Sequence, residues 1–404
     1  MTPTIAIIAA LDTKGEDFAF LKTEIERRGC KTIVIDFSIV GQPAFSADVP
    51  REEVAQASGT PFEQLLDKRD RGEAMIAMAS GVAEIVRRLY AEDAIQGIIS
   101  MGGSGATSVA TTAMRALPIG FPKVMVSTLA SGDVSGFVGT SDILMLHSVI
   151  DVTGVNRISR MIYGNAAGAI CGMVLGETPK GADKPLIAAS MFGNTTRAVN
   201  HAKAILEAAG YEVLVFHATG TGGRTMETLI ENGLVVGVLD MTTTEWADEL
   251  LGGVLSAGPD RLDAAAQNGI PQIVVPGCLD MCNFWGRETI VERYRDRTFY
   301  EWNASVTLMR TTPAETAQLG EIFARKLNTA TGPVAVYIPT RGWSEIDIEG
   351  QPFHSPEAIQ AFTDTLKANL RSDIPVVELD THINDPAFAE AAANALLALE
   401  GVKS

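Results

Sequence analysis

Short apolar runs alternate with amphipathic stretches along most of the chain. In the first half the runs occupy residues 4–9, 32–36, 95–101, 122–127 and 143–151. Runs that are apolar at nearly every position predict strands buried on both faces of a parallel sheet. The stretches between them, at residues 16–28, 73–90, 106–117 and 154–175, predict helices. In the first of these, Phe18, Leu21 and Ile25 form one apolar stripe. Alternation of this kind predicts an α/β domain.

Residues 40–72 interrupt the alternation. The segment follows the second predicted strand and carries Pro43, Pro50 and Pro61 among acidic residues. A long connection of this composition predicts an insertion or flap.

The alternation restarts after Glu177 to Pro185, a polar segment with two prolines and a glycine. This composition is typical of a linker. Beyond it, apolar runs predict strands at residues 186–190, 211–216, 235–240, 273–275, 306–309, 334–338 and 376–379, and residues 386–399 predict a helix. We therefore expect two Rossmann-like α/β domains, residues 1–180 and 181–404. Each is expected to be a mostly parallel sheet with helices on both faces, and a cleft is expected between the two domains.

Composition narrows the class of protein. The chain has 404 residues, 46% of them hydrophobic, and a formal net charge of −17. This length exceeds one ordinary core, which supports two domains. No cluster of Lys and Arg supplies a basic face, so we expect no nucleic-acid partner. No apolar run approaches the roughly 20 residues that cross a bilayer, and the N-terminus lacks a signal-peptide pattern, so we expect a cytoplasmic protein without membrane contact.

The four cysteines, Cys30, Cys171, Cys278 and Cys282, are scattered. They suggest no disulfide framework, which is typical of reduced thiols in the cytoplasm. Cys278 and Cys282 are not at zinc-binding spacing, and no nearby histidine completes a site. We therefore predict no structural metal.

The glycine-rich loop after the third predicted strand is the first candidate binding site. Residues 102–105 read Gly-Gly-Ser-Gly and lead directly into a predicted helix. A strand, a glycine turn and a helix N-terminus direct free N–H groups and a positive dipole end at one point, which favours a phosphate. The loop is neither a Walker motif nor a complete Gly-x-Gly-x-x-Gly fingerprint. A tight turn whose glycines serve only packing is the equally open alternative.

Two more polar loops end strands of the same predicted sheet. Because ligands bind at the carboxyl ends of parallel strands, the three loops are expected to converge on one pocket. The predicted nucleotide-binding residues are Asp12, Thr13, Lys14, Gly102, Gly103, Ser104, Gly105, Ser127, Ser131 and Gly132.

The second half contributes carboxylates and arginines at its strand ends. The candidate catalytic residues are Arg224, Asp240, Glu245, Asp260, Arg261 and Asp280. The two arginines are expected to hold an anionic group, while Asp240 or Glu245 serves as base or holds Mg²⁺. Charged groups are costly to bury unless they pair or bind something. The alternative is that these residues cap helices and pair with one another.

The ordered motifs also carry a family resemblance. Leu11-Asp-Thr-Lys-Gly15, Gly102-Gly-Ser-Gly105, Asp151-Val-Thr-Gly-Val-Asn156, His217-Ala-Thr-Gly220, Gly222-Gly-Arg224, Leu255 to Arg261 and Thr307 to Thr311 occur in order along nearly the whole chain. Together they resemble the ATP-binding domain at the N-terminus of the tomato mosaic virus resistance protein, which also occurs in bacterial stand-alone proteins. The resemblance implies two Rossmann-like subdomains and ATP bound by the first one, at Asp12 to Lys14 and Gly102 to Gly105. Ala106 departs from the family, which commonly has a further glycine there.

Two functions follow from these patterns. The first is an ATP-binding enzyme of small-molecule metabolism, of a transferase or ligase kind, that acts on a small anionic metabolite in the cleft between the domains. Mg²⁺ is expected with ATP. The alternative is a regulatory protein that binds nucleotide without turnover. A homo-oligomer is compatible with either function.

Overall fold

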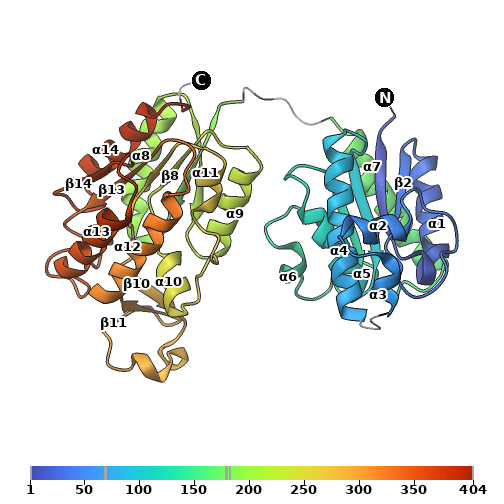
Figure 1. Cartoon of the computed structure of the whole chain (residues 1–404), viewed down its shortest axis with the longest axis horizontal. Coiled ribbons are helices and arrows are strands. Elements are labelled where there is room, and N and C mark those ends of the chain that lie inside the picture. The colour runs from blue at the N-terminus through green and yellow to red at the C-terminus, as the bar shows by residue number, and fades with distance from the viewer. Residues whose placement is uncertain (1, 68–70, 178–180, 182, 403–404) are drawn as a thin grey trace. The chain divides into compact units, whose positions relative to one another are not determined.

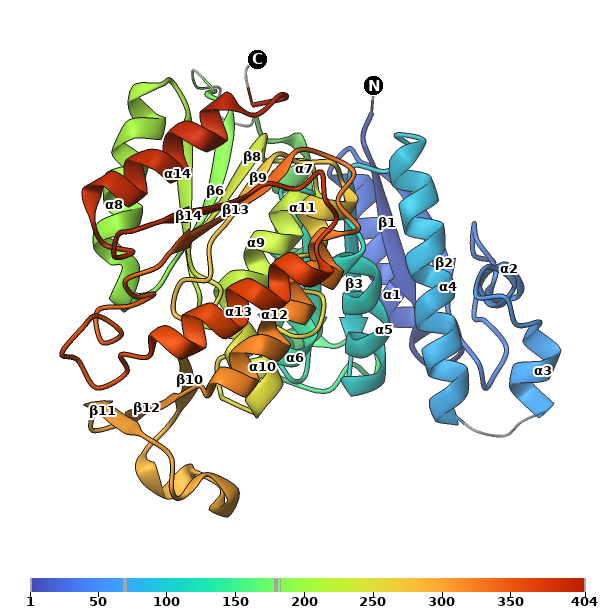
Figure 2. The same ribbon diagram turned by 60° about the vertical axis from the view of Figure 1, so that its left-hand side comes forward.

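A computed structural model describes residues 2–67, 71–177, 181 and 183–402 (Figures 1 and 2). The chain divides into two compact units, Met1–Pro179 and Lys180–Ser404. Four residues of the predicted linker, 178–180 and 182, lie outside the described residues.

The first unit is a five-stranded parallel sheet with helices on both faces, in the strand order β2-β1-β3-β4-β5. Its strands are β1 (Thr4–Ala9), β2 (Lys31–Asp36), β3 (Gly97–Gly102), β4 (Lys123–Ser127) and β5 (Leu144–His147). Its helices are α1 (Leu11–Arg27), α2 (Arg51–Ala57), α3 (Phe62–Asp67), α4 (Arg71–Ala91), α5 (Ser104–Arg115), α6 (Ser135–Val138) and α7 (Arg157–Leu175).

Alternate residues of the strands serve two separate cores. Ala6 and Ile8 of β1 pack with α4 and α5 on one face. Ile5 and Ile7 pack with α1 and α7 on the other face. The apolar runs that form β1, β3 and β4 were therefore correctly interpreted as doubly covered parallel strands. The run at residues 143–151 instead contains β5, a short edge strand that is only partly buried.

The segment predicted as an insertion or flap packs against the face of the first sheet that α4 and α5 cover. Val54 of α2 and Phe62 of α3 belong to the same core as α4, and Val49 forms a bridge with Ile35 of β2. The prolines mark where short helices begin, since Pro50 precedes α2 and Pro61 precedes α3.

The second unit contains a six-stranded parallel sheet with the order β14-β13-β9-β8-β6-β7. Its strands are β6 (Leu186–Met191), β7 (Glu212–His217), β8 (Gly237–Asp240), β9 (Gln272–Val274), β13 (Val334–Pro339) and β14 (Val376–Leu379). The helices are α8 (Thr196–Ala208), α9 (Thr221–Glu231), α10 (Glu245–Leu251), α11 (Asp263–Gln267), α12 (Pro313–Leu327), α13 (Pro356–Asn369) and α14 (Pro386–Ala398), with 3-10 turns η1 (Gly193–Thr195), η2 (Arg287–Thr289) and η3 (Glu292–Tyr294). Helices α8 and α14 cover one face, and α9 to α13 cover the other (Figure 2).

A small antiparallel sheet interrupts this second unit. Strands β10 (Met281–Phe284), β11 (Phe299–Asn303) and β12 (Val306–Arg310) pair in the order β10-β12-β11. The strand expected at residues 306–309 therefore exists, but it pairs outside the parallel sheet. Its apolar pattern predicts a buried strand and carries no information about which strand is its neighbour.

Candidate functional site

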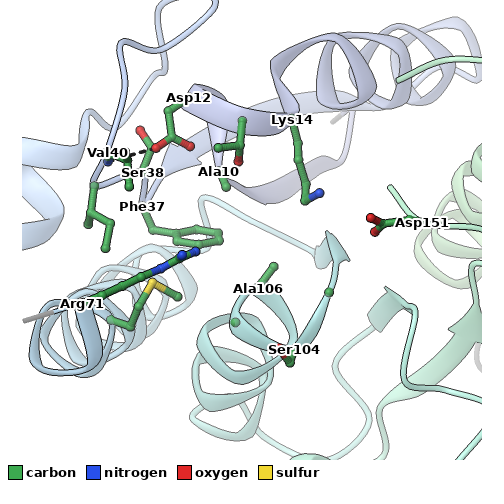
Figure 3. Close-up of a pocket in the computed structure, with 15 residues that line it drawn as sticks. Ala10, Asp12, Lys14, Phe37, Ser38, Val40, Arg71, Ser104, Ala106 and Asp151 are labelled. Carbon is green, nitrogen blue, oxygen red and sulfur yellow. Dashed lines mark hydrogen bonds between the residues drawn. The ribbon is translucent and has the colours of Figure 1, made fainter. Parts of the chain in front are cut away.

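A pocket of about 240 Å³ lies where the strand order of the first sheet reverses (Figure 3). Strands β2 and β3 follow β1 in sequence but lie on opposite sides of it. Their connections therefore leave in opposite directions and open a crevice at the carboxyl ends of the strands. Residues after β1, β2 and β3 line the pocket, together with residues of α4 and the loop before α7.

One wall of the pocket is the glycine loop and the first turn of α5. Gly103, Ser104, Gly105 and Ala106 line it. The first N–H groups of a helix have no intrahelical acceptor, so this turn presents free donors and a positive dipole end. Gly102 does not line the pocket but shapes it, since a Cβ there would lie 2.6 Å from the Ala106 Cβ and 3.6 Å from Lys14 Cε. The Ala106 methyl thus fills space that Gly102 leaves open.

Asp12, Thr13 and Lys14 form the opposite wall. They were expected in a loop, but α1 begins at Leu11 and is kinked at Lys14, whose φ is −133°. The kink lets the Lys14 side chain leave the helix direction and extend toward Asp151, where its ammonium group donates to the backbone carbonyl of Val152 (Figure 3). Lys14 therefore supplies a positive charge at the mouth of the pocket.

The loop that meets Lys14 is held from beneath by a buried acid. Asp17 of α1 accepts hydrogen bonds from Gly154 N at 2.9 Å and from the Tyr163 hydroxyl at 2.9 Å. Burial and the charge of Asp17 raise the pKa of Tyr163. The phenol therefore stays protonated and donating, and it fixes the loop that carries Asp151.

The far side of the pocket is apolar. Phe37, Ile39 and Val40 follow β2, and Met75 projects from α4. Arg71 of α4 extends beside the Phe37 ring (Figure 3). An aromatic and aliphatic wall opposite a cationic, N–H-rich wall suits a ligand with one flat apolar end and one anionic end.

The Asp12 carboxylate is hydrogen-bonded to the backbone of this apolar wall and holds it in place. One of its carboxylate oxygens accepts the backbone N–H groups of Val40 at 3.0 Å and Gly41 at 3.2 Å. Beneath it, Asp36 accepts from Leu11 N and from Ser38, and burial raises the pKa of Asp36. Both acids tie the turn after β2 to the start of α1.

The predicted loop after β4 contributes less than expected. Ser127 is buried, and its hydroxyl is 2.8 Å from Thr107 Oγ1 and accepts the N–H of Leu129. Ser131 and Gly132 are exposed and do not line the pocket. Strand β4 lies beyond β3, one place further from the reversal of strand order, so its loop ends away from the crevice.

In the second unit, three of the six candidate catalytic residues meet in one buried network. The guanidinium of Arg261 contacts Asp240 through two hydrogen bonds of 2.6 Å and Glu245 through one of 2.8 Å. It also reaches Glu227 at 3.0 Å, a residue that sequence analysis did not select. Every donor group of Arg261 therefore already has a partner inside the protein, so Arg261 has no donor to spare for an anionic substrate.

The acids of this network serve helix ends. Glu245 accepts the backbone N–H groups of Gly220 and Gly223 at the start of α9, and Glu227 accepts those of Leu262 and Ala264 at the start of α11. Burial raises the pKa of Glu227 and Glu245, although the charge of Arg261 opposes it. The N–H groups of the glycine loop at residues 217–224 would suit a bound anion, but the carboxylate of Glu245 already occupies that place.

Glycine at position 223 is required by this arrangement. A Cβ there would lie 2.2 Å from a carboxylate oxygen of Glu245. The glycine allows the internal carboxylate to approach the backbone, as it would have allowed a phosphate.

The remaining candidates lie apart from this network. Arg224 and Asp260 are exposed, and Arg224 donates to the carbonyl of Ser256. Asp280 belongs to another buried cluster, in which it accepts from the Ser344 hydroxyl at 2.7 Å while Arg310 contacts Asp347 at 3.2 Å. The six residues therefore do not form one shared group.

The Asp280 cluster carries an unusual excess of negative groups. Burial raises the pKa of Asp280, and burial together with the charge of Asp280 raises the pKa of Asp347 well above its usual value. Among the described residues, Oδ1 of Asp280 has no hydrogen-bond partner. Each acid therefore takes up a proton at a higher pH than an exposed aspartate does.

Sequence analysis missed most of the apolar wall of the pocket. The loop after β2 borders the reversal of strand order, but the sequence does not reveal that order. Glu227 could have been found from a weak sequence signal. It is an acid that lies beside the apolar residues Met226 and Ile230 on the buried side of α9. The missed residues are Ala10, Phe37, Ser38, Ile39, Val40, Arg71, Met75, Ala106, Asp151, Glu227, Arg310 and Asp347.

Comparison with known proteins matches both units to one family. The model described as the N-terminal domain of the uncharacterised protein family UPF0261 matches residues 3–179, and the model of its C-terminal domain matches residues 184–400. The division between the two matches agrees with the division between the compact units.

Individual relatives come from bacteria and from a plant. A UPF0261 protein of Clostridium tetani is 53% identical over 98% of this chain and 99% of its own length. The tomato ToMV resistance protein Tm-1(GCR237) is 37% identical over 98% of this chain and 56% of its own length. Among solved structures, Est1E from Butyrivibrio proteoclasticus covers 56% of this chain and 91% of its own, at 15% identity and a TM-score of 0.31, a likeness too small to support an argument.

Proposed function

The chain belongs to the two-domain UPF0261 family, and we propose that its N-terminal unit binds ATP in the pocket beside β1 and β3. One observation carries the proposal. The pocket joins the free N–H groups at the start of α5 to the ammonium of Lys14 on one side and to the ring of Phe37 on the other. These are the contacts that a nucleotide's phosphates and base require.

The phosphates would lie against Gly103 to Ala106, with Lys14 as the counter-charge. Asp151 is exposed and lies on the side of Lys14 that faces away from Asp12 (Figure 3). Mg²⁺ that accompanies ATP usually takes only one or two protein carboxylates and keeps several waters. Asp151 is the carboxylate we assign to it, because Asp151 accepts one backbone N–H, from Val152, whereas Asp12 accepts two, from Val40 and Gly41.

The base would lie among Phe37, Ile39, Val40 and Met75. Arg71 is placed beside this apolar wall, where its planar guanidinium can stack on an aromatic ring of the ligand. The ligand we propose is therefore a nucleotide rather than inorganic phosphate alone.

Calorimetric titration of the full chain with Mg-ATP tests the proposal. Gly105→Val should lower affinity by at least about tenfold, because a Cβ at Gly105 would lie 3.3 Å from the Met75 methyl within the pocket. Lys14→Ala should lower the affinity for ATP more than the affinity for adenosine, because it removes a positive charge and leaves the apolar wall unchanged. Gly132→Val is the matched control and should leave affinity unchanged, because Gly132 lies outside the pocket. Unaltered ATP affinity in both pocket variants, with native circular dichroism, would refute the site.

A second candidate function is an enzyme that uses the bound ATP on a small anionic metabolite. The buried and unpartnered Oδ1 of Asp280 favours it, because unsatisfied buried acids concentrate at functional sites. Phosphate release measured with a metabolite library distinguishes it from a nucleotide-binding protein without turnover. ATP binding without release under any condition favours the regulatory function.

We place the protein in the cytoplasm. All four cysteines are buried and free of disulfides, as expected where thiols stay reduced.

A further inference from the structure

Two buried oxygen atoms at the carboxyl end of the second sheet have no hydrogen-bond partner among the described residues. They are Oδ1 of Asp280, in the loop after β9, and Oδ1 of Asn194, in η1 after β6. Both side chains are fully buried. The amide nitrogen of Asn194 lies 3.7 Å from the sulfur of Met281, the residue that directly follows Asp280. A buried acceptor without a partner costs free energy, so this pair of oxygens calls for an ion or a water.

A chain of hydrogen bonds also connects the two residues from the other side. The Asn384 amide donates to the Asn194 carbonyl at 2.8 Å, and the Asn384 backbone N–H donates to His382 Nδ1 at 3.2 Å. His382 Nε2 contacts the Ser344 carbonyl at 2.8 Å, and the Ser344 hydroxyl donates to Asp280 Oδ2 at 2.7 Å. The segments after β6, β9, β13 and β14 therefore meet around the unpartnered oxygens.

The buried charges of this cluster do not balance. Two carboxylates, Asp280 and Asp347, have one guanidinium between them, because Arg310 contacts Asp347 and the backbone carbonyl of Asp280, each at 3.2 Å. His382 adds no charge while its Nδ1 accepts the Asn384 N–H, since that nitrogen then carries no proton. Burial raises the pKa of both carboxyls, as expected of acids that lack a counter-charge. With both acids ionised, one positive charge is missing.

The donor set favours a monovalent cation. The two unpartnered atoms are both acceptors, and a water that satisfied them would leave the charge uncompensated. Among the described residues, no three His, Cys, Asp or Glu side chains gather as a transition metal requires. A monovalent cation is coordinated by carbonyl, amide and water oxygens and needs no such set. The absence of a zinc-binding pattern in the sequence therefore does not bear on it.

We propose that this cluster holds one monovalent cation, K⁺ or Na⁺, bound by Oδ1 of Asp280 and Oδ1 of Asn194. Backbone carbonyls and water complete its shell. The ion supplies the missing charge and fixes the four segments that meet there. Nε of Arg310, which also lacks a partner among the described residues, is a donor and can bond to a water of that shell. The ion belongs to the folded second unit whether or not this unit also acts on a metabolite.

Thermal unfolding of the full chain in three chloride salts tests the site. The salts are those of K⁺, Na⁺ and tetramethylammonium, each at about 0.15 M, so that ionic strength is constant. Tetramethylammonium carries the same charge but is too large for a fully buried site. The midpoint of one unfolding transition should be higher in K⁺ or Na⁺, by about 3–6 °C at a tenfold excess over the dissociation constant. The larger of the two shifts identifies the ion.

Asp280→Asn should abolish the difference between the salts, because it removes the charged ligand and keeps the shape of the side chain. Asp248→Asn is the matched control. Asp248 is another fully buried acid of the same unit, but both of its oxygens accept hydrogen bonds, so this variant should keep the wild-type difference.

A crystal of the wild-type protein soaked in thallium(I), which substitutes for monovalent cations, should show an anomalous peak against Oδ1 of Asp280. This measurement decides the question by itself if Asp280→Asn does not fold. Equal midpoints in the three salts would overturn the proposal, as would a difference that Asp280→Asn retains. An ordered water at Oδ1 of Asp280 without a thallium peak would overturn it too. None of these results depends on whether the first unit binds ATP.

Discussion

Asp248 illustrates what one buried side chain does to the stability of the second unit. It is fully buried in α10, and its carboxylate accepts the N–H groups of Leu255 and Asn283 at 3.1 Å and the Asn283 amide at 2.7 Å. Burial outweighs these hydrogen bonds and raises the pKa of Asp248 to about 7. The folded protein therefore holds a proton here at pH values where the unfolded chain has lost it.

The sign of the pH effect follows from that difference. Between about pH 4 and 7 the folded state binds more protons than the unfolded state, so the free energy of unfolding falls as pH rises, by up to roughly 1.4 kcal/mol per pH unit. Asp248→Asn should remove this contribution and make the protein relatively more stable at pH 8. The new amide can donate to Asn283 Oδ1, which has no partner among the described residues.

Urea unfolding of the wild type and Asp248→Asn at pH 5 and pH 8 measures the effect. The difference in stability between the two proteins should change sign or shrink strongly across this range. Asp296→Asn, at an exposed position, should follow the wild type at both pH values. If the free energies of unfolding of the wild type and Asp248→Asn changed equally between pH 5 and pH 8, the prediction of a raised pKa for Asp248 would be wrong.

At the scale of elements, the Arg261 network connects four pieces of the second unit. One guanidinium contacts the end of β8 through Asp240, the start of α10 through Glu245 and the middle of α9 through Glu227. The two glutamates in turn satisfy N–H groups at the starts of α9 and α11. The network therefore fixes the positions of helix ends that have few other polar partners.

Arg261→Leu should lower the free energy of unfolding by about 3–5 kcal/mol, because it leaves three buried carboxylates without their counter-charge. The matched change Arg224→Leu removes an exposed arginine and should cost no more than about 0.5 kcal/mol. Denaturant unfolding gives both values. ATP affinity of folded Arg261→Leu should equal that of the wild type. A loss of affinity with unchanged stability would instead assign Arg261 to a ligand.

At the scale of the whole molecule, the cores on the two faces of the first sheet and those on the two faces of the second sheet belong to separate units. We therefore expect calorimetry to show two unfolding transitions rather than one. At a concentration a hundred times its dissociation constant, Mg-ATP should add about 2.7 kcal/mol to the free energy of unfolding of one unit. The midpoint temperature of that unit's transition should therefore rise. Lys14→Ala should abolish that shift and leave the other transition unmoved. A single transition, or equal shifts in both, would contradict independent units with ATP bound by the first.

The sequence alone predicted the elements and the class of fold. Continuous apolar runs such as residues 4–9, and helical stripes such as Phe18, Leu21 and Ile25, depend on neighbours within one segment. They are local, so they can be read in the order of the chain. The glycine loop of residues 102–105 was found in the same way, because a strand, a turn and a helix start are consecutive in sequence. The structure places that loop in the wall of the pocket.

The tertiary structure alone decided which polar groups meet. The order β2-β1-β3 brings Phe37 into the pocket and leaves Ser131 and Gly132 outside it, and strand order has no local signature in the sequence. The same reason explains what occupies the glycine loop of residues 217–224. Its N–H groups suited an anion, but only the fold shows that the anion is Glu245, more than twenty positions further along the chain. A loop's chemistry is determined by its own residues, whereas its occupant is determined by whichever charge the packing of distant elements brings within reach.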